Sequence, residues 1–251
     1  MIRKSGNRFS LATNAERVWV GPEAATAHTG IVFSGDAAFA TIVNSMLAMI
    51  NEGPNGRQYL REISAASNPA KGKVTHIVQN RDGDTFTVPV LTPHQAEKAG
   101  ILTTDEHRSN AEAAKLAEKR TIAGLKVRGR GTKAIVQWDD RRSLQIDPQG
   151  RPYGTMRENG PRHAVLIHEL VHAQHMMAGD WKNGGDPRDP ATPSGKEEVR
   201  AMRYENGVRQ DHNLPLRTQY AEVPPPDEES RAPSVNSGFT SVHTDPSVVW
   251  D

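Results

Sequence analysis

The spacing of hydrophobic residues predicts two helices that organise the chain. In Ala37–Glu52, apolar side chains recur every three or four positions, and Asp36 precedes them as the expected N-cap. The second periodic stretch runs from Pro161 to Gly179; proline suits a first helical turn, and glycine suits the position after a helix C-terminus. The buried side of the first helix is predicted to consist of Phe39, Ile42, Val43, Met46, Leu47 and Ile50.

Runs of β-branched and aromatic residues predict several short strands. The runs are Arg17–Val20, Gly30–Ser34, Lys73–Gln79, Thr85–Val90 and Ala134–Trp138. Asp82-Gly83 lies between the third and fourth runs, and because this pair favours a tight turn, the two runs are expected to form a β-hairpin. The fifth run is expected at the edge of a cleft, where a strand can pair with an extended substrate.

The more polar stretches predict shorter helices and loops. Arg57–Ile63, Pro93–Ala99 and Lys196–Arg209 are expected to be helical. Thr104–Arg120 contains one large apolar residue, which predicts a solvent-exposed helix or a mobile loop. Lys126–Lys133 is basic and rich in glycine; a solvated loop is favoured over a nucleic-acid contact, because no aromatic residue is available to stack on bases.

The composition changes at both ends of the chain. Residues 1–16 are polar and lack a continuous apolar core, which predicts a leader or linker rather than a secretory signal peptide. Residues 222–251 are rich in Pro and Ser, have little to bury, and are expected to be disordered. Residues 17–221 remain as one folded domain.

Charge and cysteine content narrow the classes of function. The 251 residues carry a net charge of +1, so no nucleic-acid partner is expected. The chain has no cysteine, which excludes disulfides and cysteine-ligated zinc and leaves His, Asp and Glu as metal ligands. No apolar run approaches the roughly 20 residues that span a bilayer, so no membrane span is predicted. The protein is expected to be a monomer.

The sequence HELVH at residues 168–172 is the HExxH pattern of zinc hydrolase helices. Residues four apart lie on one face of a helix, so His168 and His172 can bind the same ion. Glu169 is then placed to act on a water molecule as a general base. A buried helix with two structural histidines is the less favoured alternative.

A third ligand is expected from the helix that follows. Glu197 and Glu198 are adjacent near its start, and their side chains point about 100° apart, so only one of them can face the ion. Glu198 is the predicted ligand, because the small Ala201 three residues later would let the helices approach closely. Glu197 is expected to support a ligand or cap the helix. His175 is expected to be a histidine on the rim of the site, with a role in supporting a ligand or contacting substrate as the alternative.

Arg217 and Tyr220 lie three residues apart in LPLRTQY and follow a proline. A guanidinium and a phenol directed at one cleft would stabilise the oxyanion of a tetrahedral intermediate. We therefore predict that these two residues complete the catalytic set.

Three blocks, HELVHAQH, EEVRAMRYEN and LPLRTQY, resemble the NleD-like effector metallopeptidases of bacterial type III secretion, in the same order. The stretch GDAAFATIVNSMLAMINEGPNGRQYLREI is similar to the start of that domain, and the order of motifs also resembles the clostridial neurotoxin light chains. The resemblance implies Glu198 as ligand, Arg217 and Tyr220 as stabilisers of the transition state, and host signalling kinases of the MAP-kinase class as substrates.

Together these observations predict an α+β, zincin-like metalloprotease fold. A small mixed sheet would pack on helices, with the HExxH helix at the active site and a helical C-terminal part. The predicted protein is a secreted effector or toxin that is delivered into a host or target cell and cleaves proteins there, with one catalytic Zn²⁺. The alternatives are a non-catalytic binding module of the same fold and a metal-dependent amidohydrolase that acts on a non-protein substrate.

Overall fold

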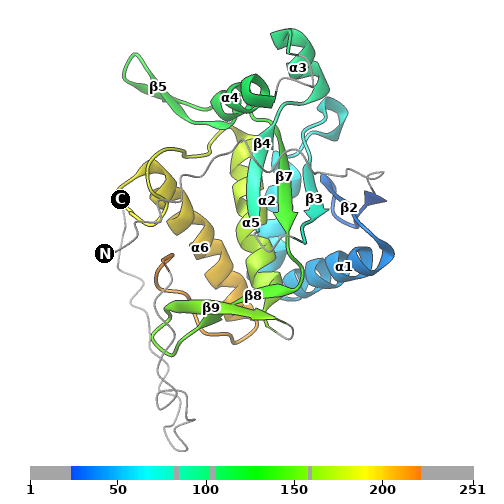
Figure 1. Cartoon of the computed structure of the whole chain (residues 1–251), viewed down its shortest axis with the longest axis vertical. Helices are drawn as coiled ribbons and strands as arrows, with labels where there is room; N and C mark the ends of the chain where they lie inside the picture. The colour runs from blue at the N-terminus through cyan, green and yellow to red at the C-terminus, as the bar shows by residue number, and fades with distance from the viewer. Residues whose placement is uncertain (1–23, 82–84, 102–105, 158–159, 222–251) are drawn as a thin grey trace, which may run out of the picture.

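A five-stranded mixed sheet packed on helices forms the body of the protein (Figure 1). The computed structural model describes residues 24–81, 85–101, 106–157 and 160–221. Strands β2, β3 and β7 are parallel to one another, whereas β1 and β4 at the two edges of the sheet run antiparallel to them. This architecture confirms the expected α+β class. In spatial order the strands are β1 (Ala24–Ala25), β2 (Ile31–Ser34), β3 (Thr75–Gln79), β7 (Lys133–Trp138) and β4 (Phe86–Val90).

Two consecutive helices follow β2. Helix α1 spans Ala37–Glu52, as the periodicity predicts, and the Asp36 side chain caps it by accepting a hydrogen bond from the Phe39 amide. Helix α2 spans Pro54–Ala66 and therefore begins earlier than the predicted Arg57. The reason is that Pro54 occupies the first helical turn, where its missing N–H has no partner to lose.

The position of β7 overturns two predictions about strand pairing. The expected hairpin between β3 and β4 is wrong, because β7 lies between them and pairs with both. Val136 of β7 stands opposite Ile77 on one side and Thr87 on the other. A strand paired on both sides cannot be a cleft edge, so β4 takes the place at the edge that was expected for Ala134–Trp138. Residues 82–84, which include the Asp-Gly pair, lie outside the described residues.

Helix α5 (Arg162–Ala178) lies at the centre of the core. It packs against β7 and β4 on one side and against α1, α2 and α6 (Pro193–Asp211) on others. Trp138 of β7 is fully buried and meets the ring of Phe39, with ring centroids 5.9 Å apart. Gly207 allows α6 to approach α2, since a Cβ atom there would come 2.4 Å from the Tyr59 hydroxyl oxygen.

The segment between β4 and β7 contains more structure than its polar sequence predicts. Helix α3 spans Pro93–Ala99, as expected. Helix α4 spans Glu106–Ala117 and packs on β4 and α5 through Ala113 and Ala117, which are fully buried. The predicted helix is therefore present and no mobile loop is seen at α4, but one face of the helix is packed rather than exposed, because alanine supplies the contact face in place of large apolar residues.

Two antiparallel hairpins complete the described fold. Strands β5 (Arg120–Ile122) and β6 (Leu125–Val127) form one of them, in a region where only a basic loop was predicted. Strands β8 (Arg142–Ile146) and β9 (Pro152–Arg157) form the other, and β8 contacts α5.

The predictions for residues 1–16, for a strand at Arg17–Val20 and for the tail 222–251 concern parts of the chain outside the described residues. Within the residues that the structure describes, no helix is both long enough and apolar enough to cross a bilayer.

Candidate active site

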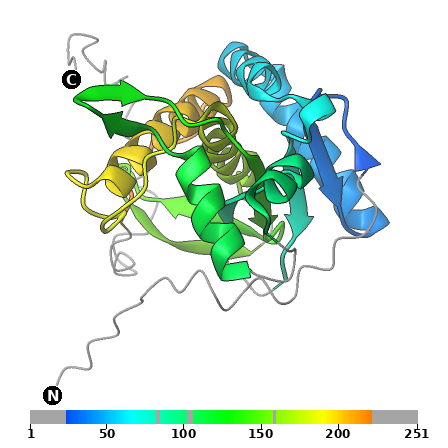
Figure 2. The same cartoon turned by 90° about the horizontal axis from the view of Figure 1, so that it is seen from above.

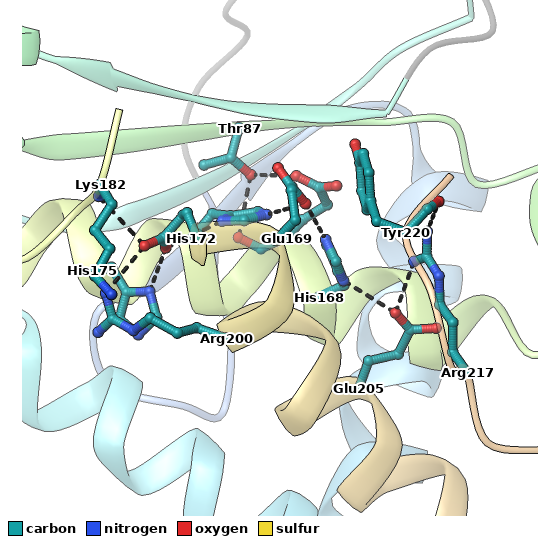
Figure 3. A network of polar contacts seen from close by, with 12 residues as sticks. Thr87, His168, Glu169, His172, His175, Lys182, Arg200, Glu205, Arg217 and Tyr220 are labelled. Carbon is teal, nitrogen blue, oxygen red and sulfur yellow. Dashed lines mark hydrogen bonds and ion pairs between the residues drawn. The ribbon is translucent and has the colours of Figure 1, made fainter. Parts of the chain in front are cut away.

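Helix α5 presents His168 and His172 on the side that faces α6 (Figure 3). The helix is buried over most of its length, and both histidines are nearly inaccessible to solvent. Their ring centroids are 4.9 Å apart, as expected for residues one turn apart on the same helix face. Gly179 ends the helix in the left-handed conformation, with φ of 70°, which confirms its predicted role after the C-terminus.

Glu198 of α6 meets both histidines at the same side of their rings. Its Oε2 atom lies 3.0 Å from Nε2 of His168 and 3.3 Å from Nε2 of His172. Each of the three residues offers a ligand atom within 4.8 Å of the other two, and no other such group of His, Cys, Asp and Glu occurs among the described residues. The structure thus brings together the three side chains that the sequence predicts as metal ligands.

The other ring nitrogen of each histidine faces a second carboxylate of α6. His168 Nδ1 lies 3.0 Å from Oε2 of Glu205, and His172 Nδ1 lies 3.3 Å from Oε1 of Glu197. An ionised carboxylate only accepts hydrogen bonds, so each Nδ1 is placed to donate its proton to Glu205 or Glu197; a neutral ring protonated in this way keeps a free electron pair on Nε2, the atom that faces Glu198. This tautomer is the one that binds a metal through Nε2. Glu197 therefore lies where a supporting carboxylate was expected.

Glu205 also joins the histidine to the C-terminal segment. Oε1 of Glu205 accepts from Nε of Arg209 at 2.7 Å, and Oε2 accepts from Arg217 at 3.1 Å. All three side chains are buried. The Arg217 guanidinium also donates to the carbonyl oxygens of Gln219 and Tyr220. Arg217 is thus bound to the carboxylate that supports His168 and to the chain that leads into Tyr220.

Tyr220 lies beside His168, with its ring nearly parallel to the imidazole and 6.3 Å between ring centroids. The guanidinium carbon of Arg217 is 5.0 Å from the centre of the Tyr220 ring (Figure 3). Asn206 of α6 fixes this segment by bonding to both the amide and the carbonyl of Arg217, each at 2.7 Å. The predicted Arg217 and Tyr220 pair therefore stands at the histidine site.

Glu169 is held from the opposite side by β4. The Thr87 hydroxyl lies 2.7 Å from Oε2 of Glu169 and 3.1 Å from its carbonyl oxygen. A hydroxyl has one proton to donate, and the carboxylate is both nearer and the stronger acceptor. The edge strand of the sheet thus orients the carboxylate that the HExxH motif assigns as a base.

These arrangements agree with the comparison to known protein families. The model of peptidase family M91, described as an effector protein, matches residues 27–220. The chain belongs to this family. The match confirms the resemblance to NleD-like effector metallopeptidases that the three sequence blocks indicate. No curated protein sequence matches this M91 chain.

Several botulinum neurotoxin light chains are similar to this M91 chain in structure. For the Clostridium botulinum serotype F light chain, the identity is 14%, the TM-score is 0.32, and the match covers 56% of this chain and 35% of that one. For the type G light chain, the identity is 13% and the TM-score is 0.36; the match covers 78% of this chain and 60% of that one. For the type D light chain, the identity is 11% and the TM-score is 0.38; the match covers 80% of this chain and 59% of that one. The M91 chain thus spans between about a third and three fifths of the length of these light chains.

Charge balance keeps the carboxylates of the M91 site ionised. Burial by itself would raise the pKa of Glu197, Glu198 and Glu205, but hydrogen bonds and opposite charges from the histidines and arginines outweigh it and bring each pKa well below its usual range. Burial likewise works to lower the pKa of His172, and Glu198 and Glu197 reverse that effect and raise it. A site with three ionised carboxylates around two imidazoles is suited to a cation.

His175 differs from its predicted position on the rim of the site. It is 3% exposed, and its Nδ1 contacts Oε1 of Glu197. The reason is that α6 covers α5 along its length, so that one turn beyond His172 the helix is still buried. Arg200 binds the same carboxylate at 3.0 Å, so His175 belongs to the group that supports His172.

Two residues of the M91 site, Glu205 and Thr87, were not predicted from the sequence. Glu205 follows Glu198 by seven positions, or two helical turns, and this spacing was the signal that would have found it. Thr87 has no comparable signal, because its approach to Glu169 depends on β4 being the edge strand beside α5.

Proposed function

We propose that this chain is a zinc endopeptidase that acts inside a target cell on protein substrates. His168, His172 and Glu198 hold one Zn²⁺ and leave the fourth position for water. The observation that carries the proposal is the orientation of the imidazoles. Both Nε2 atoms face Glu198, and both Nδ1 atoms face carboxylates.

The residues present fit zinc in chemistry as well as in placement. Two imidazoles and a carboxylate are a common ligand set for catalytic zinc, and the chain has no cysteine to compete. The carboxylates of Glu205 and Glu197 fix the imidazole orientation and raise its basicity. A bound zinc ion would lower the pKa of water and polarise the carbonyl of a scissile peptide.

Glu169 acts as the general base. It takes a proton from the attacking water and passes it to the nitrogen of the leaving amine. Thr87 orients this carboxylate by donating to Oε2, which leaves Oε1 to face the water. Thr87 is therefore a positioning residue, since it acts through Glu169.

Tyr220 and Arg217 serve the oxyanion that forms when water attacks the carbonyl. Tyr220 supplies its hydroxyl from beside His168, and Arg217 holds the Tyr220 segment through its carbonyl and its ring. Whether the Arg217 guanidinium itself meets the oxyanion stays a prediction. Three of its donors bind Glu205, Gln219 and Tyr220, and its other two are left for that role.

An extended substrate would lie along β4, the edge strand whose Thr87 meets Glu169. Main-chain pairing with an edge strand gives affinity, and side-chain pockets on alternate residues give specificity. The resemblance to NleD-like effectors suggests host signalling kinases as substrates. The description of the family as an effector protein supports the proposal of delivery into the host cell.

The test combines metal analysis with protein cleavage. Glu169→Gln should bind zinc at the same stoichiometry as the natural protein and lose nearly all cleavage in a target-cell lysate, a decrease of about 100-fold or more. Fragments are identified by labelling new N-termini. Full zinc content with unchanged cleavage in Glu169→Gln would remove Glu169 from the mechanism. Absence of near-stoichiometric zinc in the natural protein would instead favour a non-catalytic binding module.

A further inference from the structure

The β5–β6 hairpin carries most of the exposed large apolar side chains of the described structure. Ile122 is 58% exposed, Leu125 is 70% exposed and Val127 is 44% exposed; Leu216 is the one other large hydrophobic residue in this class among the described residues. Ile122 pairs with Leu125 and Arg120 pairs with Val127, so the three apolar side chains share one face of the hairpin. An apolar face without an intramolecular partner marks an interaction surface.

Cations lie on both faces of the hairpin: Arg120 shares the apolar face, and Lys126 lies on the opposite face. No Asp or Glu occurs between residues 119 and 138. Lys126, Arg128 and Arg130 are exposed, and none of them has an ion-pair partner in the described part of the chain. Arg120 donates to the carbonyl oxygen of Lys115, and it has no ion pair with any of the described residues. The hairpin therefore combines an apolar face with a net positive field.

The hairpin is held firmly at its base and projects at its tip. At the base, the Gly129 amide donates to the carbonyl of Gly179 at 2.7 Å, and the Lys119 amide donates to the carbonyl of Trp181 at 3.2 Å. At the tip, Ala123 and Gly124 both have positive φ, which is the requirement of a tight two-residue turn. Figures 1 and 2 show the hairpin standing away from the body of the protein. Its presentation is thus fixed by the same loop that ends helix α5.

We propose that the β5–β6 hairpin docks the protein on an anionic lipid bilayer. The Ile122 and Leu125 pair would enter the boundary between headgroups and acyl chains, and Lys126, Arg128 and Arg130 would meet anionic headgroups. Interfacial elements bind in this way, through apolar side chains flanked by cations. The projecting shape suits a yielding surface such as a bilayer, whereas a protein partner would need a groove matched to this tip.

Nucleic acid is the less suitable anionic partner. The cations of the hairpin would bind phosphates, but its exposed apolar side chains are aliphatic. Single strands are bound largely by stacking of bases on aromatic rings, and Ile122, Leu125 and Val127 provide none. The apolar face would remain in water in such a complex, so the lipid surface accounts for more of the observed features.

The test is sedimentation of the full chain with phospholipid vesicles. We expect binding to phosphatidylcholine vesicles that contain roughly a quarter phosphatidylserine, and little binding to pure phosphatidylcholine. Replacement of two cations, Arg128→Gln with Arg130→Gln, should lower the partition coefficient by about 25-fold, at about fivefold for each charge. Ile122→Ser with Leu125→Ser should lower it by about 100-fold or more. The matched control, Arg61→Gln with Lys71→Gln, removes two exposed cations elsewhere and should change binding little.

Three results would overturn the proposal. Equal binding to both kinds of vesicle would remove the role of lipid charge. If Arg128→Gln with Arg130→Gln abolished binding and Ile122→Ser with Leu125→Ser did not, the vesicle binding would be electrostatic adsorption without insertion of apolar side chains. Unchanged vesicle binding in both variants, with slower cleavage of a protein substrate, would make the hairpin a protein-docking site. Vesicle binding does not depend on zinc or turnover, so this result stands apart from the outcome for Glu169→Gln.

Discussion

The two histidines of the site are supported by carboxylates in different surroundings. Glu205, behind His168, is bound to Arg209 and Arg217, whose side chains are 1% and 8% exposed. Glu197, behind His172, is bound to Arg200, which is 23% exposed and also pairs with Asp180. In the first group Glu205 is the only carboxylate described for the two buried arginines, whereas in the second group Arg200 is partly exposed and has Asp180 as a second carboxylate. We therefore expect the Glu205 side to matter most for folding and the Glu197 side mostly for metal affinity.

The largest difference is expected in zinc content. Glu198→Ala removes a proposed ligand and should leave too little bound zinc to detect after dialysis against metal-buffered solution. Glu197→Ala removes only the support of His172 and should lower affinity by about 10–100-fold, leaving partial occupancy. Atomic absorption of the dialysed proteins measures both. If Glu197→Ala lost more zinc than Glu198→Ala, the ligand would have to be reassigned to Glu197.

The next effect is on stability. Glu205→Ala leaves Arg209 and Arg217 buried without their carboxylate, which should cost about 3–5 kcal/mol of unfolding free energy. Glu197→Ala should cost about 1–3 kcal/mol, because Arg200 retains Asp180 and access to water. Urea unfolding of metal-free protein gives both values, with Glu97→Ala, an exposed carboxylate of α3, as control. Equal costs for the two buried carboxylates would contradict the comparison.

His163 precedes His168 on helix α5, and it makes the stability of the region around Glu205 depend on pH. Burial, followed by the nearby charges of His212 and Arg209, lowers the pKa of His163 from 6.5 to about 4. The unfolded chain therefore binds more protons between these values, so stability is fully present above pH 6.5 and is lost as the pH falls toward 4. The contribution is on the order of 1–3 kcal/mol.

His163→Phe should flatten the stability profile of metal-free protein between pH 6.5 and 4. The exposed His94→Phe of α3 serves as control and should leave the profile unchanged. An identical acid dependence in His163→Phe and the natural protein would exclude His163 as the titrating group.

The smallest effect is expected at Thr87. Thr87→Val removes the hydrogen bond to Glu169 while keeping the size and β-branching of the side chain, and should lower kcat by about tenfold, as the loss of about 1–1.5 kcal/mol implies. KM and zinc content should stay constant, and Thr87→Ser should restore most of the rate. A uniform loss of activity in both variants, or a change in KM alone, would point to a structural role of the strand.

Local patterns predicted the helices well, and they predicted the grouping of His168, His172 and Glu198. Helix α1 has the predicted limits because its periodicity and its Asp36 cap agree. The HExxH spacing places two imidazoles together, and the adjacent Glu pair narrows the third ligand to one choice that the geometry at Glu198 matches. The limits of α1 and the pairing of the two imidazoles depend on neighbours within one or two helical turns, whereas Glu198 reaches them from a separate helix, α6.

Features that depend on distant segments were not predictable in the same way. The order of β3, β7 and β4 is set by pairing between strands more than 40 residues apart, and the local Asp-Gly signal favoured a different pairing. The β5–β6 hairpin turns at Ala123-Gly124, and alanine rarely adopts the positive φ that this turn requires. The network around Glu205 forms because the segment after α6 folds back along this helix and brings Arg217 to the Glu205 carboxylate.

Helix α6 joins functions that arise from separate parts of the sequence. It carries Glu198 and Glu205, and through Asn206 it also holds the backbone of Arg217, and with it the segment that ends in Tyr220. A local opening that lifted α6 from α5 would therefore remove the metal ligand, its neighbour's support and the phenol in one event. The site should thus behave cooperatively in native-state hydrogen exchange, with one opening free energy shared by the amides of α6 and activity lost in a single step.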